Sequence, residues 1–312
     1  MEWDDRIGRR LRLKDLHTLQ TVAEVGSMAK ASEHLALSQP AISKAVSEME
    51  RILSVPLLDR SARGVELTEF GRLLVERARV IFDEIREGVS DIEHLSDPTR
   101  GTVRIGATEP VTGIVSQIIS RLARKYPRIS HDVMISDLDT LLGALRERTR
   151  DVVVTRWTPP PEADDLAVQE LFKSPLAVMA ARDHPLLQRK KLRVGDLMEE
   201  KWTLAPSGSF LGRVVVDLFH RRKLPLPPTI ATSMSVNMRL SLVASGGFLT
   251  VLPRLMLRYP SHKAWLRALD VDLSDSSQPI VYITLKRRRS GGALRLFEQA
   301  TIDICKTMAE SK

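Results

Sequence analysis

Residues Ser27–Thr68, SMAKASEHLALSQPAISKAVSEMERILSVPLLDRSARGVELT, decide the fold of the N-terminal part of the chain. Ser27 is placed to cap one short helix. Ser38 is placed to cap a second helix with Pro40 in its first turn, where a missing N–H costs nothing. The second helix carries one apolar stripe at helical spacing: Ile42, Val46, Met49 and Leu53. Two short helices joined by a tight turn predict a helix-turn-helix.

The second helix shows polar groups on its other face. Gln39, Ser43 and Lys44 lie off the apolar stripe and present an amide, a hydroxyl and an ammonium group. Such groups hydrogen bond to base edges and phosphates, so we expect this face to read the major groove of DNA. Beyond the helix, apolar residues bracket the segment Arg60–Gly64 (RSARG), which predicts a two-stranded wing with a basic tip.

The run SQPAISKAVSEMERILSVPLLDR (38–60), followed by GVELTEFG (64–71), closely resembles the DNA-binding domain of LysR-type transcriptional regulators. The upstream run LKDLHTLQTVAEVGSMAKASEHL (13–35) looks like the first two helices of that domain. The rest of the chain resembles the family in length and element order. The resemblance implies a regulator that binds double-stranded DNA as a homodimer or homotetramer, with RNA polymerase as a further candidate partner. The residues expected to contact DNA are Gln39, Pro40, Ser43, Lys44, Arg60 and Arg63.

Charge is unevenly distributed along the chain. The net charge is +8, yet residues 1–98 hold 14 Lys or Arg and 18 Asp or Glu, against 33 and 21 in the remainder. The case for DNA binding therefore depends on where individual charges lie and not on the net charge. Arginines before the first helix form either a solvated tail, which we favour because termini are usually disordered, or a phosphate-contacting arm. They are Arg6, Arg9, Arg10 and Arg12.

Length and composition narrow the class of protein. A chain of 312 residues suits two or three domains. The single cysteine, Cys305, allows no intrachain disulfide, which fits a reducing compartment. No apolar run is long enough to span a bilayer, and the N-terminus lacks the apolar core of a signal peptide. We therefore expect a cytoplasmic protein without membrane contact.

A long helix follows the wing. Thr68 is placed to cap a helix from Glu69 to about Ser96, on which apolar residues alternate at spacings of four and three. This stripe either packs on its own domain or, as we expect, meets a second copy of the helix. The resemblance also implies a dimerising linker helix here. The stripe consists of Leu74, Ala78, Ile81, Ile85, Gly88, Ile92 and Leu95.

Strands and helices then alternate to the end of the chain, which predicts parallel sheets with crossover helices. Together with the resemblance, this indicates a periplasmic-binding-protein-like sensor of two subdomains, and an overall α/β fold behind an all-α winged helix-turn-helix domain. We expect a DNA-binding domain at 1–68, a linker helix at 69–96, a hinge at 97–102 and a sensor at 103–312. Within the sensor, subdomain I spans about 103–173 and 278–312, and subdomain II spans about 174–277.

Polar residues at strand ends and helix starts mark the expected effector site, because open α/β sheets bind ligands there. For each residue alone, a capping hydroxyl without a ligand is an equally good interpretation. The resemblance places effectors in the cleft between the subdomains and matches Thr108 and Ser207 best. Hydroxyl donors, helix N-termini and the basic sensor half predict a small anionic effector, its charge neutralised by Arg156. The candidates are Thr108, Ser136, Arg156, Ser207 and Thr250. Thr155, beside Arg156, and Ser209, beside Ser207, hold the same strand end and helix start.

No constellation in the sequence demands catalysis. Cys305 lies in an apolar helical stretch, which favours a packing thiol over a nucleophile. The seven histidines form no metal-binding spacing, and no nucleotide-binding glycine motif occurs. We therefore expect no enzyme, no metal and no cofactor other than a small-molecule co-inducer. The alternative is a cytoplasmic small-molecule-binding protein or enzyme fused to a helix-turn-helix.

Overall fold

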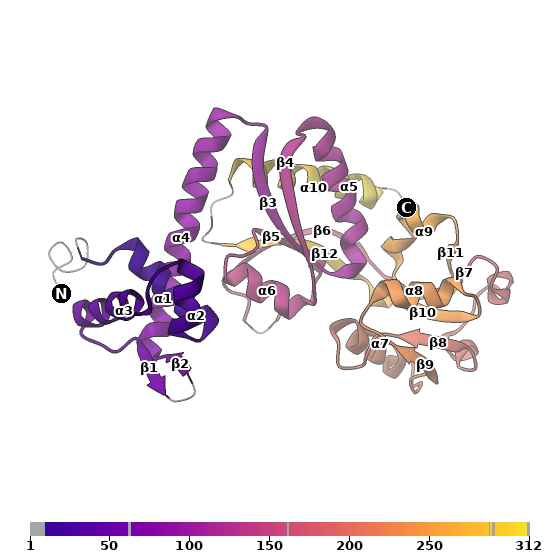
Figure 1. The fold of residues 1–312 in the computed structure, drawn as a ribbon. Helices are drawn as coiled ribbons and strands as arrows, with labels where there is room; N and C mark the ends of the chain where they lie inside the picture. The colour runs from indigo at the N-terminus through magenta and orange to yellow at the C-terminus, as the bar shows by residue number, and fades with distance from the viewer. Residues whose placement is uncertain (1–9, 62–63, 161, 287, 289–290, 311–312) are drawn as a thin grey trace. The chain divides into compact units, whose positions relative to one another are not determined.

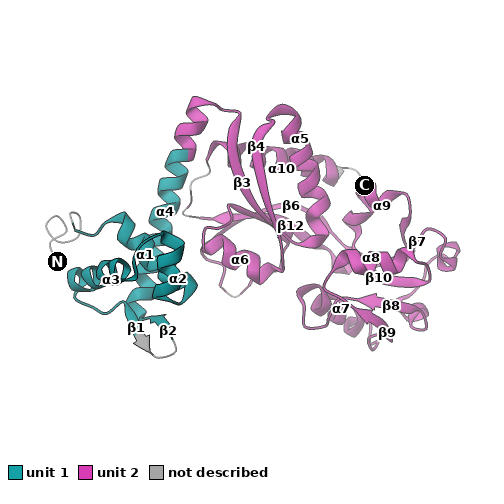
Figure 2. Ribbon diagram, viewed as in Figure 1, with its two compact units in different colours: residues 1–89 teal, residues 90–312 magenta. Residues whose placement is uncertain are grey.

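Three helices open the computed structural model, α1 (Leu13–Val25), α2 (Met28–Leu35) and α3 (Gln39–Leu53) (Figure 1). The structure describes residues 10–61, 64–160, 162–286, 288 and 291–310. The chain divides into two units, residues 1–89 and 90–312 (Figure 2). The two units are described separately below.

Capping fixes the starts of α2 and α3 as expected. The Ser27 hydroxyl accepts a hydrogen bond from the Lys30 N–H at 3.4 Å, and the Ser38 hydroxyl accepts one from the Ala41 N–H at 3.3 Å. Ala36 ends α2 in a left-handed conformation, with φ of 51°. The tight turn between the two helices follows from this residue, and the predicted helix-turn-helix is confirmed.

The apolar stripe of α3 builds the core of unit 1. Ile42, Val46 and Met49 are buried as expected. At the end of the stripe Ile52 is buried, whereas Leu53, which was expected there, is only partly buried. The stripe packs against apolar residues of α1, α2 and the segment after α3, namely Leu16, Leu19, Val22, Met28, Ala31 and Leu57.

A two-stranded wing follows α3. Strands β1 (Leu58–Ser61) and β2 (Gly64–Leu67) pair antiparallel from Leu58 opposite Leu67 to Ser61 opposite Gly64. The Glu50 carboxylate accepts hydrogen bonds from the N–H groups of Leu57 and Leu58, at 2.8 and 3.3 Å. The end of α3 thereby holds the start of the wing.

Helix α4 (Glu69–Ser96) begins where the sequence predicts. The Thr68 hydroxyl accepts a hydrogen bond from the Gly71 N–H at 3.0 Å and caps the helix. Gly71 packs so closely on the wing that an added Cβ would lie 2.1 Å from the Leu57 carbonyl oxygen. Only glycine lets α4 pass this point.

Unit 2 contains a first five-stranded sheet in the order β4-β3-β5-β12-β6. Valines and isoleucines alternate faces along its strands, so α5 and α10 cover one face and α6 the other. The strands are β3 (Arg100–Ala107), β4 (Arg128–Ile135), β5 (Val152–Arg156), β6 (Leu166–Ser174) and β12 (Gln278–Leu285). The helices are α5 (Thr112–Lys125), α6 (Leu138–Arg146) and α10 (Gly292–Glu310).

A second five-stranded sheet has the order β11-β7-β10-β8-β9. Helix α7 packs on one face of this sheet and α8 on the other. The face covered by α8 belongs to the same apolar core as the first sheet. The strands are β7 (Leu176–Ala181), β8 (Lys201–Leu204), β9 (Thr229–Thr232), β10 (Phe248–Pro253) and β11 (Leu266–Ala268). The helices are α7 (Phe210–Arg221) and α8 (Val236–Ala244).

Both sheets are mixed, which corrects the expectation of parallel sheets. In the first, β3 runs parallel to β4 and β5, whereas β12 pairs antiparallel with both β5 and β6. In the second, β7 pairs antiparallel with β10 and β11. The antiparallel strands lie where the chain crosses between sheets, so a returning strand must run against its neighbours. The alternation of strands and helices does not reveal that reversal.

Two further details differ from expectation. Strand β6 was not predicted, since its polar and apolar residues do not alternate and its burial follows no period of two. Residues 100–102 of the expected hinge belong to β3 and pair with residues 128–130 of β4, so only residues 97–99 separate α4 from the sheet.

Candidate functional site

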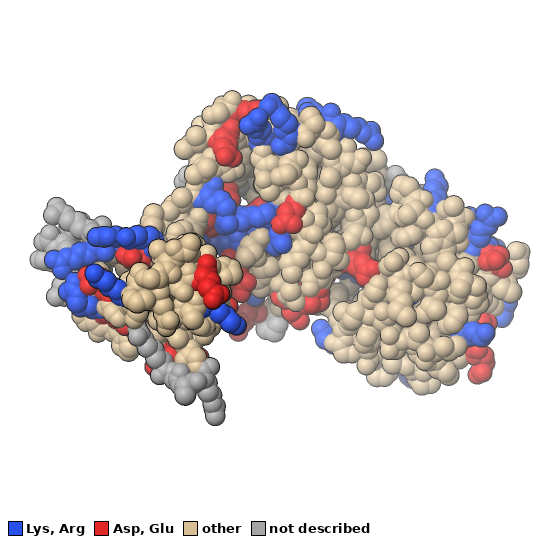
Figure 3. All heavy atoms as spheres, viewed as in Figure 1, with Lys and Arg blue, Asp and Glu red and all other residues tan. Residues whose placement is uncertain are grey.

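The outer face of α3 is open to solvent. Gln39, Pro40 and Lys44 are exposed and Ser43 is half-buried. All four lie in the first two turns of the helix, away from the buried Ile42 and Val46. Lys and Arg side chains gather on the surface of unit 1 over α3, with a few acidic side chains between them (Figure 3).

One ion pair lies further along this surface. Arg51 donates hydrogen bonds to both carboxylate oxygens of Glu48, at 2.6 and 2.9 Å. These bonds hold the pKa of Glu48 below its ordinary value, and the charges of Arg51, Arg10 and Lys44 act in the same direction.

Several predicted cationic residues are only partly described. Arg10 and Arg12 are exposed. Arg60 belongs to β1, but its side chain lies outside the described part of the structure. Arg6, Arg9 and Arg63 lie outside the described residues.

The apolar stripe on α4 has two parts. Ala78 is fully buried in the core of unit 1, and the partly buried Leu74 packs against that core. The expectation that Ala78 meets a second subunit is therefore wrong, because its own domain covers it. A dimer contact by the half-buried Leu74 stays a prediction. The exposed part begins at Ile81, 38% exposed, and reaches Leu95, 84% exposed. It also includes Ile85, Val89 and Ile92.

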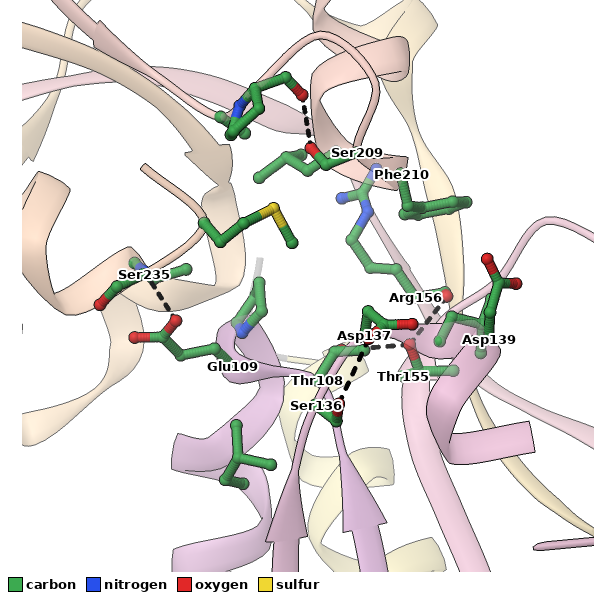
Figure 4. Close-up of a pocket in the computed structure, with 18 of the residues that line it drawn as sticks. Thr108, Glu109, Ser136, Asp137, Asp139, Thr155, Arg156, Ser209, Phe210 and Ser235 are labelled. Carbon is green, nitrogen blue, oxygen red and sulfur yellow. Dashed lines mark hydrogen bonds between the residues drawn. The ribbon is translucent and has the colours of Figure 1, made fainter. Parts of the chain in front are cut away.

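A cleft of about 690 Å³ opens in unit 2 between the carboxyl ends of strands from both sheets (Figure 4). Thr108, Ser136 and Arg156 line it, as the sequence predicts. The hydroxyls of Thr108 and Thr155 lie 3.1 Å apart, which joins the ends of the adjacent strands β3 and β5. The Ser136 hydroxyl donates to the Asp137 carboxylate at 3.3 Å.

Ser207 does not line the cleft, which Ser209 lines in its place. Ser207 is exposed in the turn before α7. Ser209 is the N-cap of α7, and its hydroxyl accepts a hydrogen bond from the Gly212 N–H at 3.1 Å. The cap position of the helix, and not the start of the turn, decides which serine faces the cleft.

Thr250 is also absent from the cleft. It lies inside β10 opposite Met179 and is fully buried. The sequence made it a candidate because it follows a Gly-Gly turn, but it lies inside the strand that was expected from Phe248 and not at a strand end.

Arg156 lines the cleft but uses its guanidinium elsewhere. It donates to the carbonyls of Ser174 and Ser276, at 2.9 and 3.2 Å, and to the Gln278 side chain at 2.9 and 3.2 Å. These acceptors lie on the two segments that cross between the sheets. Burial lowers the pKa of Arg156 to about 10. The expected role of Arg156 as the partner of an effector charge is therefore corrected to that of a clamp at the crossover.

Two residues that the sequence interpretation missed join the cleft. The Glu109 carboxylate accepts hydrogen bonds from the Val236 and Asn237 N–H groups, at 2.7 and 2.8 Å, and so links the end of β3 to the start of α8 (Figure 4). Arg239 lies on α8 in line with the buried Leu240 and Val243. The sequence did contain a sign that Arg239 is unusual, because a charged residue stands there within the apolar stripe of an expected helix.

Two observations in the described part of the chain bear on catalysis. Burial raises the pKa of the Cys305 thiol to about 12, which keeps it in the unreactive protonated form. Among the described residues, His, Cys, Asp and Glu nowhere gather into a group of three that could hold a metal ion. None of the helices in the described part is long and apolar enough to cross a membrane.

A helix-turn-helix with a wing, joined to a two-sheet domain with a central cleft, defines a class of ligand-binding transcription factors. Residues 13–72 match the model of bacterial regulatory helix-turn-helix proteins of the lysR family, and residues 96–305 match the LysR substrate binding domain. The chain therefore belongs to the LysR family. It is a DNA-binding transcriptional regulator with an effector-binding domain, and the alternative of an enzyme is not favoured.

Known proteins show the same organisation. The HTH-type transcriptional regulator GbpR of Azospirillum brasilense is 30% identical over 249 residues, 79% of this chain and 73% of that protein. The LysR family regulator CbnR shares the fold with a TM-score of 0.64 and 20% identity, over 95% of this chain and 99% of that one. The CcmR regulatory domain of Synechocystis PCC6803 gives a TM-score of 0.58 and 22% identity, over 67% and 99%.

Proposed function

We propose that this chain binds an operator through the exposed face of α3 and that a small anionic effector in the cleft of unit 2 controls its action. The observation that carries the first half is the open, polar first two turns of α3, on a helix whose other side is buried. A helix of this kind fits the major groove. Because operator DNA of a bacterial regulator lies in the cytoplasm, we propose that the protein works there.

Base readout is assigned to three side chains. Gln39 suits adenine, Lys44 suits guanine, and Ser43 reaches either a base or a nearby phosphate. Pro40 allows close approach at the helix start. Arg60 and Arg63 on the wing are proposed to contact the backbone or the minor groove.

Fluorescence anisotropy with a duplex from upstream of the chain's own coding sequence tests DNA recognition. We expect tighter binding to this duplex than to a scrambled duplex, and an affinity that falls steeply as salt rises. Equal affinity for both duplexes at every salt concentration would contradict sequence-specific recognition.

The exposed stripe on α4 is proposed to pair with the same helix of a second copy. Five apolar residues from Ile81 to Leu95 remain exposed on one side of the helix. A two-fold dimer would cover them and present two recognition helices to two half-sites. A homotetramer through the sensor domains extends this proposal, and RNA polymerase is the partner that such an assembly would meet upstream of a promoter.

Sedimentation velocity of the full chain tests whether the exposed stripe on α4 forms the dimer interface, called the seam below. In Ile81→Glu/Ile85→Glu, each unpaired carboxylate placed in the seam costs at least about 2 kcal/mol, so we expect dissociation of the α4 pair. The control is Glu76→Lys, since Glu76 is exposed about half a turn away from the stripe. An unchanged oligomer in the double variant would place the interface elsewhere.

The cleft supports the second half of the proposal. The hydroxyls of Thr108, Ser136 and Ser209 line it together with the starts of three helices, α6, α7 and α8. These groups donate hydrogen bonds and favour negative charge. The CcmR regulatory domain has been solved in complex with 2-PG, which supports a ligand-binding role for this fold. We propose that the cleft closes on the ligand and that this closure alters how the DNA-binding units are held. The coupling free energy between ligand binding and DNA binding would be about 1–3 kcal/mol.

A further inference from the structure

One buried arginine in the cleft lacks the partners that such a side chain needs. Arg239 lies on α8 and lines the cleft although it is only 1% exposed. Within the part of the chain that the structure describes, its Nε and Nη1 atoms have no hydrogen-bond partner. Buried guanidinium groups are normally paired with carboxylates or carbonyls, as Arg156 is.

The charge of Arg239 persists despite this burial. Burial lowers the pKa of its guanidinium to about 10, and the nearby charge of Glu109 acts in the opposite direction. A group with that pKa is protonated at neutral pH. The cleft therefore contains a cation that has lost its water and has not gained an equivalent set of acceptors.

The charge of Glu109 acts on Arg239, but Glu109 leaves the Nε and Nη1 atoms of that arginine without a hydrogen bond. Its two carboxylate oxygens accept from the N–H groups of Val236 and Asn237 at the start of α8. The Ser235 hydroxyl accepts from the third first-turn N–H, that of Met238, at 3.2 Å. An internal carboxylate thus already occupies the N-terminus of α8, and an outside anion must bind elsewhere in the cleft.

The charges around the cleft limit how many negative charges a ligand carries. Three arginines line it, Arg156, Arg213 and Arg239, opposite three carboxylates, Glu109, Asp137 and Asp139. Arg156 is committed to the crossover segments, and Arg213 is exposed and donates to the Gly208 carbonyl at 2.6 Å. One arginine is left for a ligand, and the carboxylates oppose further negative charge.

We propose that Arg239 is the residue that pairs with the charged group of the effector, and that the effector is a small organic monoanion. Its uncharged part lies on the apolar side chains of the cleft, among them Ile135, Phe210 and Met234. This inference deepens the proposed function and rests on it. Of the three helices that start at the cleft, Asp137 caps α6 and Glu109 occupies the start of α8, whereas the Ser209 hydroxyl caps α7. The start of α7 is therefore the N-terminus without one of these carboxylates.

Thermal unfolding with and without butyrate tests the proposal on the full chain. Butyrate carries one carboxylate and a short apolar tail, and butyramide is its neutral isostere. Both are titrated to about 100 mM at constant ionic strength, because ligands of this size bind with millimolar dissociation constants. We expect a saturable rise in the melting temperature of the wild type with butyrate and none with butyramide.

The variant Arg239→Met separates a ligand-binding role from a structural role. Removing an unpaired buried charge is expected to raise the melting temperature of the free protein by a few degrees and to abolish the response to butyrate. The matched control Arg189→Met removes one positive charge from an exposed position outside the cleft and is expected to keep that response. Arg239→Lys keeps the charge and is expected to keep a weaker response.

Several outcomes would overturn the proposal. They are a wild type that does not respond to butyrate, an Arg239→Met protein that is less stable than the wild type or unfolded, and an unchanged butyrate response in Arg239→Met. Operator affinity, measured separately by anisotropy, keeps the two proposals distinct. Intact operator binding with no butyrate response rejects the Arg239 site alone, whereas a butyrate response without operator binding rejects the proposed DNA recognition.

Discussion

The DNA-facing surface of α3 and the cleft of unit 2 are built in opposite ways. The α3 surface comes from one continuous helix, in which each exposed side chain is set by its spacing from Ile42, Val46 and Met49. The cleft draws its walls from segments as far apart as Thr108 and Arg239. A single cap and one apolar stripe suffice to define the first, whereas the second exists only after both sheets have formed.

Arginines illustrate what this difference means. On the α3 surface, Arg51 pairs with Glu48 one turn away and both remain exposed. In the cleft, Arg156 reaches Ser276 and Gln278, more than a hundred residues further along the chain. Local sequence fixes the first pairing, and the crossover between sheets fixes the second. The comparison predicts that changes at α3 alter DNA binding alone, while changes in the cleft alter stability and ligand response.

The largest effect is expected for Arg156→Met. The change leaves the buried carbonyls of Ser174 and Ser276 without their donor, so the free energy of unfolding of unit 2 should fall by about 3–5 kcal/mol. Urea unfolding followed by tryptophan fluorescence measures this loss. The exposed Arg213→Met serves as control and should stay within about 0.5 kcal/mol of wild type. A stable Arg156→Met protein would refute the clamp.

A change of Gln39 tests the α3 side of the comparison. Gln39→Ala should weaken operator binding by about 1–3 kcal/mol and relax specificity at one base pair. Urea unfolding should not change, because Gln39 is exposed. Anisotropy with single-base variants of the operator measures both affinity and specificity. Lys190→Ala, an exposed change in unit 2, is the control. Retention of full affinity and specificity by Gln39→Ala would remove this residue from the readout.

Replacing each of two glycines of α4 by alanine is expected to change stability in opposite directions. Gly71→Ala places a Cβ against the Leu57 carbonyl and should destabilise unit 1 by about 1–3 kcal/mol. Gly88→Ala meets no atom within 4 Å and should stabilise the helix by up to about 1 kcal/mol. Thermal unfolding measures both changes. Equal shifts in the two variants would show that helix propensity, and not the contact with the wing, governs Gly71.

The smallest effect is expected at Cys305. Because burial raises the pKa of the thiol to about 12, only about one thiol in 10⁴ is ionised at pH 8. Iodoacetamide should leave the native protein unmodified and alkylate Cys305 after unfolding in urea. Intact-mass spectrometry measures the modification. Rapid alkylation of the native chain would reopen the possibility of a reactive cysteine.

Sequence alone determined the helix-turn-helix, the start of α4 at Thr68 and the α/β class of the larger unit. These features depend on caps and periodic apolar residues, which act within a few turns of the chain. It also identified Thr108 and Ser136 as cleft residues, because each follows directly on a strand.

Tertiary structure alone decided the rest. Antiparallel pairing of β12, the use of Ser209 in place of Ser207, and the burial of Thr250 and Ala78 depend on contacts between distant segments. The same holds for the two buried arginines. Arg156 finds acceptors across the crossover, whereas Nε and Nη1 of Arg239 find none among the described residues. The Glu109 carboxylate is already bonded to the start of α8. Spacing along a chain can place a charge on a helix face or at a strand end, but only the packed fold determines whether that charge has a partner.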